Sequence, residues 1–431
     1  PNPLVDESLM ETDWVVIDAD DGDIVTRVEM PGKVGQAAFS PDKRSLAFLA
    51  AADRADPTAG TLHVANARNG EVRAIAREAE QHVMDFAWTA DGDLLALAHV
   101  GTKSALVTYT AEGEERARTP HDAQVFRSID LDRESGAIAA VADAAAHPRE
   151  LFTAQGGEAF ERRTSLNPQL ADIAFGEQRT IRYAARDGLE IEAWVTSPQG
   201  EGPFPVVIMP HIGPSAFFQG GYDARAAFFA ANGYLVLSPN VRGSGGRGEA
   251  FEAAGHGEFG DAMVTDLIDG FDALVDRGIA KPDGYCVFGR RWGGYAGLMA
   301  AIKDPARVGC VATYGAPTDP VSAFNSDDVF TGGATGAWRA YLGEALENRD
   351  AAAAIAPRRR AGEIHAEILM FHGEDDMAVP AAHMRFMRNE RRDKARYEFI
   401  EGESADISRR ETRARILSES LALFDDHHPA R

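Results

Sequence analysis

The sequence predicts two architectures in tandem: an all-β repeat domain, then a doubly wound α/β domain with a mostly parallel sheet. Residues 1–167 consist of short alternating apolar and polar runs broken by turn pairs, which is typical of antiparallel strands. Residues 168–431 alternate continuous apolar runs with amphipathic helical patterns, which is typical of a sheet covered on both faces. A chain of 431 residues also has the length of about two to three domains.

A weak repeat organises the first domain. Residues 35–50 resemble residues 84–98 and, more loosely, residues 126–142; each is a strand, a turn and a second strand. A second hairpin candidate follows each copy, at 61–76, 105–118 and 150–163. Two hairpins per unit, recurring at a spacing in the forties, predict the four-stranded blades of a β-propeller. A generic β-sandwich is the alternative.

The opening residues 14–29 resemble the last hairpin of a further blade. We therefore expect three blades and a fragment over residues 1–167. Because propellers close with about four or more blades, either upstream blades are missing or the propeller is partial. The chain begins at Pro1 with no signal-type segment, so a processed or truncated product is possible.

The second domain starts with a hairpin over residues 179–198. Apolar runs rich in β-branched residues predict buried strands at 204–213, 233–243, 285–289, 308–315 and 367–373. Helical spacing of apolar residues predicts helices at 261–278, 381–392 and 409–428. Doubly wound sheets place their chemistry on loops at the carboxyl ends of the strands, so those loops are the candidate site.

The charge balance excludes some classes of partner. Lys and Arg number 44 against 67 Asp and Glu, a formal net charge of −23. A field of that sign repels nucleic acids and anionic membrane surfaces. No apolar run approaches the roughly 20 residues that span a bilayer, so we expect a soluble protein, cytoplasmic or periplasmic.

The two cysteines, Cys286 and Cys310, lie inside apolar strand-like runs. We expect both to be small buried hydrophobes rather than parts of a disulfide framework or zinc site. The adjacent carboxylates Asp375 and Asp376 could suggest a metal site. The sequence frame of residues 372–380 is a sufficient explanation for them, so we expect neither a metal nor a cofactor.

One strand-to-helix turn carries a recognisable glycine frame. A nucleophilic serine on such a turn sits in a Gly-x-Ser-x-Gly sequence, because the turn is strained and its strand and helix pass closely. Here the predicted strand 285–289 leads into Gly289-Arg290-Arg291-Trp292-Gly293-Gly294-Tyr295, followed by a helix. The frame is intact, but the nucleophile position holds Arg291.

From about residue 178 onward the chain resembles the prolyl oligopeptidase family, close to its acylaminoacyl-peptidase and dipeptidyl-peptidase branch. The resemblance rests on five motifs: His211-Ile212-Gly213-Pro214 for a usual HGGP, residues 238–244 for PNxRGS, residues 289–295 for GxSxGGY, residues 372–380 for HGxxDxxVP, and residues 401–405 for a turn usually ending in His. It implies an α/β-hydrolase domain preceded by a propeller, and serine peptidase activity.

The resemblance also shows what this chain lacks. Of the Ser-Asp-His triad it implies, only the acid is retained, as Asp376; Arg291 replaces the serine and Ala405 the histidine. Arginine stays protonated and is no nucleophile, and alanine has no base. In the implied oxyanion region, Trp292 follows the nucleophile position, while His211 and Ile212 open the HGGP-like loop.

Loss of the imidazole should leave Asp376 unpaired, and a buried unpaired carboxylate is costly. We therefore expect an ion pair between Arg291 and Asp376. Three serines could act as substitute nucleophiles: Ser404 beside the missing base, Ser244 in an elbow-like RGSGG turn, and Ser215 after the HGGP-like loop. For each, a turn, capping or solvent role is the simpler explanation.

Two hypotheses follow. The first is a non-hydrolytic homologue that binds peptides or acts as a scaffold. The second is an active serine-type hydrolase that acts on peptides through a rearranged nucleophile. In either case the expected partner is a peptide or small acyl ligand in a cleft between the domains, and a homo-oligomer is possible.

Overall fold

The computed structural model describes residues 12–54, 56, 58–121, 124–155, 158–170, 173, 175–326 and 335–430. The chain divides into two compact units. The first comprises the residues up to Ile173 together with Gln219–Tyr222 and Gly245–Glu252. The second comprises the remaining residues to the carboxyl end.

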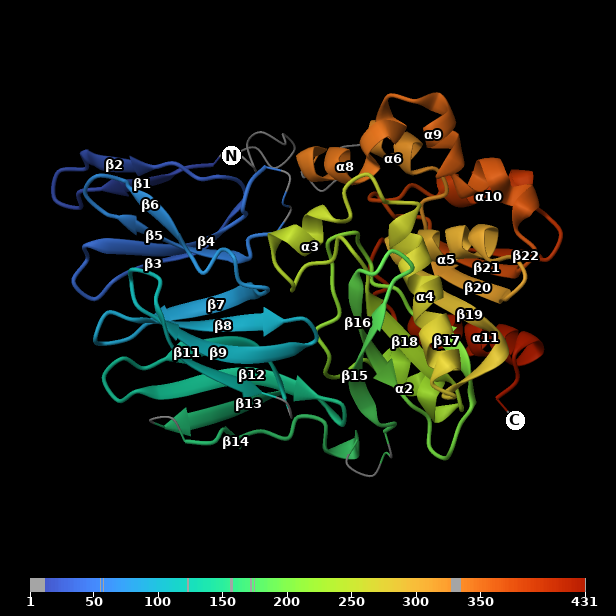
Figure 1. Cartoon of the computed structure of the whole chain (residues 1–431), viewed down its shortest axis with the longest axis horizontal. Coiled ribbons are helices and arrows are strands. Elements are labelled where there is room, and N and C mark those ends of the chain that lie inside the picture. The colour runs from blue at the N-terminus through green and yellow to red at the C-terminus, as the bar shows by residue number, and fades with distance from the viewer. Residues whose placement is uncertain are drawn as a thin grey trace. The chain divides into compact units, whose positions relative to one another are not determined.

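The first unit is built from small antiparallel sheets (Figure 1). A two-stranded sheet pairs β1 (Trp14–Ile17) with β2 (Ile24–Val28). Three four-stranded sheets follow in chain order: β3 (Val34–Phe39), β4 (Ser45–Ala50), β5 (Thr61–Asn66) and β6 (Val72–Ile75); β7 (His82–Trp88), β8 (Leu94–Val100), β9 (Lys103–Tyr109) and β10 (Glu115–His121); β11 (Val125–Leu131), β12 (Ala137–Ala144), β13 (His147–Gln155) and β14 (Glu161–Arg162). The repeat therefore predicted this strand grouping correctly.

The second unit contains one eight-stranded sheet, in the order β15-β16-β18-β17-β19-β20-β21-β22. Its strands are β15 (Gln178–Ala184), β16 (Glu190–Thr196), β17 (Phe204–Ile208), β18 (Leu235–Asn240), β19 (Ala280–Arg290), β20 (Val308–Tyr314), β21 (Glu367–Gly373) and β22 (Ala395–Ile400). The strands β15, β16 and β18 pair antiparallel, and the pairs from β18 through β22 are parallel. The predicted α/β-hydrolase class is confirmed.

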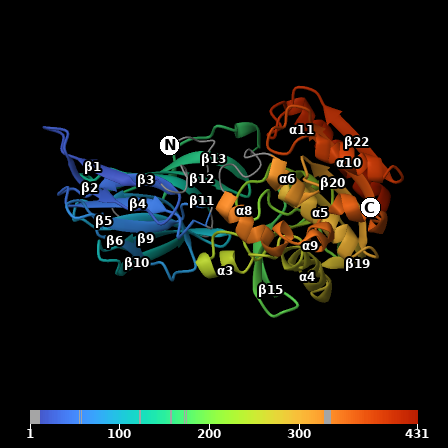
Figure 2. The same ribbon diagram turned by 90° about the horizontal axis from the view of Figure 1, so that it is seen from above.

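Helices cover both faces of this sheet, as Figure 2 shows for α11 and α4. On one face, α2 (Ala224–Ala231) and α11 (Arg410–His427) bury Phe229 and Phe424 against strand residues such as Phe288. On the other lie α4 (Ala262–Asp276) and α5 (Trp292–Lys303). The remaining elements are η1 (Pro168–Leu170), α3 (Glu249–Ala253), α6 (Pro320–Ser326), α8 (Thr335–Leu342), η2 (Gly343–Leu346), α9 (Arg349–Ala354), η3 (Pro357–Glu363) and α10 (Ala382–Glu390).

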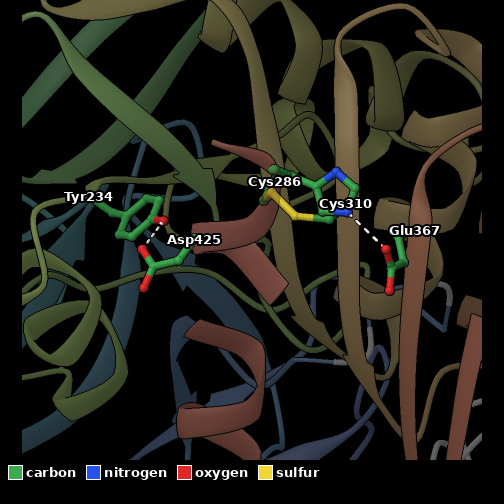
Figure 3. Close-up of a disulfide and its surroundings, with 6 residues drawn as sticks. Tyr234, Cys286, Cys310, Glu367 and Asp425 are labelled. Atoms are coloured by element: carbon green, nitrogen blue, oxygen red, sulfur yellow. Dashed lines mark hydrogen bonds and ion pairs between the residues drawn. A yellow bond between two sulfur atoms is a disulfide. The ribbon is translucent and has the colours of Figure 1, made fainter. Parts of the chain in front are cut away.

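The expectation of two unpaired cysteines is wrong. Cys286 of β19 and Cys310 of β20 are register partners, and their sulfurs form a disulfide (Figure 3). Both residues are fully buried, as expected. The sequence placed the cysteines on two strands but did not give the register that sets their Cα atoms 4.7 Å apart. Among the described helices, none combines the length and apolarity needed to cross a lipid bilayer.

Candidate functional site

The strand-to-helix turn predicted from the glycine frame joins β19 to α5. Its central residue, Arg291, has φ 48° and ψ −121°, a strained conformation for a residue with a side chain. A Cβ on Gly289 would lie 2.3 Å from the carbonyl of Gly293, and one on Gly293 would lie 2.6 Å from the oxygen of Pro210. The glycines are therefore needed for the close passage of strand, helix and the neighbouring 210–213 loop.

The expected ion pair between Arg291 and Asp376 is absent. The half-buried Arg291 guanidinium has no carboxylate within 4.0 Å in the described part of the chain. One Asp376 oxygen accepts hydrogen bonds from the amides of Ala378, at 3.0 Å, and Val379, at 2.9 Å. The carboxylate is thus partly satisfied by its own loop, which the sequence argument had not considered.

The second oxygen of Asp376, Oδ2, is buried and has no hydrogen-bond partner. It lies 3.8 Å from Nε2 of His372, which donates its hydrogen to the carbonyl of Val379 at 2.7 Å. Burial lowers the pKa of His372, so its ring stays neutral at pH 7. The side chain of Asp376 is therefore buried, and no imidazole is hydrogen-bonded to its free oxygen.

The turn that carries Ala405 is firmly held. Glu403 is fully buried and accepts bonds from Ser408 and Arg409. The hydroxyl of Tyr314, at the end of β20, donates to the carbonyl of Ser404 at 2.6 Å. The structure thus brings this turn to the strand ends, and only the side chain at 405 departs from the family pattern.

Sequence reasoning missed Arg290. Its guanidinium donates to the carbonyl of Ala405 at 3.1 Å and lies 3.4 Å from a carboxylate oxygen of Asp406. It also lies over the Tyr314 ring, 5.8 Å from the centroid. Arg290 is the last residue of β19 and Arg291 lies in the turn, so the sequence marked both as strand-end residues but gave no signal that Arg290 would contact the 405–406 turn.

In the region expected to form an oxyanion hole, the backbone donor is already in use. The amide of Trp292, which would be one donor of an oxyanion hole, donates instead to the carbonyl oxygen of Ile212 at 3.2 Å. The ring of Trp292 stacks on that of His211, with centroids 5.0 Å apart and planes at 19°. The three residues expected in the oxyanion region therefore meet, with the Ile212 carbonyl bonded to the expected donor.

A serine and a histidine form an unexpected pair. Nε2 of His211 lies 2.9 Å from Oγ of Ser244, and Nδ1 lies 2.5 Å from the carbonyl of Gly213. A carbonyl only accepts, so Nδ1 carries the hydrogen and the Ser244 hydroxyl donates to Nε2. Burial lowers the pKa of His211 to about 4. Ser244 is fully buried, and the third partner is a carbonyl, not an acid.

The other two candidate serines lie outside any such pairing. The exposed Ser404 hydroxyl donates to the carbonyl of Asp406 at 3.3 Å, and Ser215 is half-buried. Within the described ranges, no cluster of three or more His, Cys, Asp or Glu side chains is arranged to hold a metal ion.

Comparisons with known proteins agree with this architecture. Residues 221–416 match the model of the prolyl oligopeptidase family. Dipeptidyl aminopeptidase BIII from Pseudoxanthomonas mexicana is 33% identical over 155 residues, covering 34% of this chain and 22% of that protein. The chain spans 22%, 24% and 36% of three curated relatives that it matches.

Solved structures share the fold. A Mycobacterium tuberculosis puromycin-hydrolyzing peptidase superimposes with a TM-score of 0.80 at 20% identity, over 99% of this chain and 66% of that one. An acylaminoacyl peptidase from Pyrococcus horikoshii gives 0.78 at 18% identity, over 97% and 66%. The chain is therefore similar, over residues 221–416, to the prolyl oligopeptidase family.

Proposed function

We propose that this chain is a non-hydrolytic homologue that binds peptides at the strand ends of its hydrolase domain. One observation carries the proposal: the turn that presents a nucleophile in the family presents the guanidinium of Arg291, and the next amide is bonded to Ile212. A guanidinium cannot attack a carbonyl, and a carbonyl acceptor in the oxyanion position opposes the developing negative charge. The chemical step thus lacks nucleophile, base and one oxyanion donor.

Peptide binding is proposed because the relatives that the chain matches are named as peptidases and because the loops that surround the turn are held in place by specific contacts. The Glu403 turn, the Asp376 loop and the Gly289–Gly293 frame are ordered by specific contacts. Loss of chemistry with retention of these loops favours a binding role over a purely structural one.

A second candidate, a hydrolase with a rearranged nucleophile, rests on the contact between Ser244 and His211. The pair has the hydrogen-bond direction of a serine and its general base. Its burial argues against it, because the Ser244 side chain is fully enclosed and a carbonyl carbon must approach the nucleophile to about 3 Å.

Labelling with a fluorophosphonate probe tests both candidates. We expect no labelling of the unmodified chain and labelling of the double variant Arg291→Ser, Ala405→His. The single variant Arg291→Ser is the matched control, since it restores the hydroxyl without the base. Labelling of the unmodified chain that disappears in Ser244→Ala would instead establish the rearranged nucleophile.

A further inference from the structure

Two guanidinium groups follow one another at the carboxyl end of β19, a third in α2 adds positive charge to their surroundings, and the proposed lack of hydrolysis does not explain them. Arg290 and Arg291 are consecutive, and Arg225 of α2 is close enough to affect Arg290. The pKa of Arg290 is lowered, first by burial and then by the positive charges of Arg225 and Arg291, against which Asp406 acts. Cations that repel one another in a partly buried place cost folding energy unless an anion balances them.

The three arginines differ in how their charges are balanced. Arg225 is bonded to Asp223, with an N–O distance of 2.5 Å. Arg290 has the exposed Asp406 at 3.4 Å, while its buried Nε has no hydrogen-bond partner. Arg291 has no hydrogen bond or ion pair from its side chain within the described residues. The cluster thus contains one unbalanced guanidinium and one unused buried donor.

The surroundings select the kind of anion. A guanidinium offers a planar fork of donors that matches a carboxylate in two parallel bonds. Asp406 lies 3.4 Å from Arg290, and Asp376 lies beside Gly315 at the end of β20, so a doubly charged phosphate meets more repulsion than a singly charged carboxylate. A neutral backbone carbonyl is a poor alternative, because the Trp292 amide that would bind it is already bonded to Ile212.

We propose that Arg291, assisted by Arg290, binds the free carboxyl terminus of a short peptide at this strand-end site. The inference rests on the proposed function, because a peptide carboxylate at position 291 occupies the place where a catalytic serine would act. The inference restricts the expected ligands to peptides whose carboxyl terminus lies at the site and excludes internal segments of longer chains.

Calorimetric titration with two matched peptides tests this. Acetyl-Ala-Ala-Ala with a free carboxyl terminus should bind at least about tenfold more tightly than the same peptide with a terminal amide. Arg291→Ala should abolish that difference, and Arg291→Lys should retain part of it, since lysine keeps the charge without the fork. Arg396→Ala, an exposed arginine of β22, is the control and should leave the difference unchanged.

Several outcomes overturn the inference. Equal binding of acid and amide, absence of binding by either, or a preference that survives Arg291→Ala in a variant with unchanged thermal unfolding each refutes it. Stronger competition by inorganic phosphate than by acetate also refutes it, because the site would then be a general anion site. These binding results do not bear on whether the chain hydrolyses peptides. Fluorophosphonate labelling of the unmodified chain would refute the proposed function, whatever the ratio of acid to amide binding.

Discussion

The amide nitrogen of Trp292 donates a hydrogen bond to the carbonyl oxygen of Ile212 across 3.2 Å. This contact uses the backbone N–H that follows Arg291, the residue at the nucleophile position of the family motif. Ile212 stands where the family motif has a glycine, and its side chain is 47% exposed, so burial of that side chain does not hold the loop in place. The backbone contact is therefore what occupies the Trp292 amide, the expected oxyanion donor.

We expect that restoring the triad alone gives weak turnover and that opening the hole increases it. Glycine at 212 lets the 212–213 peptide rotate and free the Trp292 amide. One oxyanion donor is worth about 10²–10³ in kcat, so Ile212→Gly combined with Arg291→Ser and Ala405→His should exceed the double variant by about that factor. Hydrolysis of p-nitrophenyl acetate measures it.

The matched control for this prediction is Ile212→Ala in the same double variant. Alanine removes the bulk of the side chain but keeps a Cβ that restricts rotation. If the alanine and glycine versions are equally fast, bulk and not the backbone contact closes the site. If neither exceeds the double variant, the contact has no bearing on turnover.

A second prediction concerns the buried pair of Arg242 and Asp266. The Arg242 amide and guanidinium both bond Asp266, at 2.9 Å and 2.8 Å, and the outer side of the guanidinium bonds Asp187 at 2.6 Å. Because Asp266 is fully buried, Arg242→Met leaves an uncompensated charge and should lower the free energy of unfolding by about 3–5 kcal/mol. Urea unfolding followed by tryptophan fluorescence measures this loss.

Arg186→Met is the comparison, because Arg186 also pairs with an aspartate of α4, Asp269, but its side chain is 56% exposed. We expect it to cost less than about 1 kcal/mol. Equal costs for the two arginines would show that burial does not control the energy of these pairs.

A third prediction is a loss of stability in acid that depends on Glu403. Burial alone would raise the pKa of Glu403, but hydrogen bonds from Ser408, Thr412 and Arg409 outweigh it and lower the pKa to about 2. The folded protein thus holds the proton more weakly than the unfolded chain. The stabilising contribution of Glu403 is present above about pH 4.5 and disappears as the pH falls toward 2.

Unfolding free energies measured from pH 6 to pH 2 test whether the contribution of Glu403 to stability is lost as the pH falls. Glu403→Gln should be less stable than the unmodified chain at pH 6, and the two should converge as the pH approaches 2. Glu401→Gln, an exposed glutamate of the same turn, should run parallel to the unmodified chain. A constant gap between Glu403→Gln and the unmodified chain over the whole range would contradict the prediction.

Local sequence patterns predicted the structural features that depend only on residues close together in the chain. Turn pairs and alternation gave the strand grouping of the first unit, and the glycines at 289 and 293 gave the strained turn at Arg291. The sequence could not give contacts set by several loops at once. The failed pairing of Arg291 with Asp376 is one example, because the Ala378 and Val379 amides that bond Asp376 depend on how its loop folds.

The contact between His211 and Ser244 escaped prediction for the same reason. The two residues follow different strands, β17 and β18, which are neighbours in the parallel sheet, so their loops emerge at the same edge. The sequence predicts that shared edge but not which side chains meet there. The disulfide belongs to this class as well, since register decides whether residues on adjacent strands are opposite.

The disulfide supplies the last prediction. Cys286 and Cys310 are 24 residues apart, and the helix α5 lies within the loop that they close. A cross-link of that length stabilises by about 3 kcal/mol in the chain-entropy account. The double variant Cys286→Ala, Cys310→Ala should therefore lower the free energy of unfolding by about that amount, and the unmodified chain, unfolded without reductant, should contain no thiol that reacts with Ellman's reagent.

The single variant Cys286→Ala separates the cross-link from packing, because it breaks the bond while losing only one sulfur from the core. It should cost nearly as much as the double variant, and reduction of the unmodified chain should produce a comparable loss. Two reactive thiols in the unreduced chain would show that the cysteines are unpaired. Any cost of the alanine variants would then come only from lost packing of these two strand residues against the core that α11 covers.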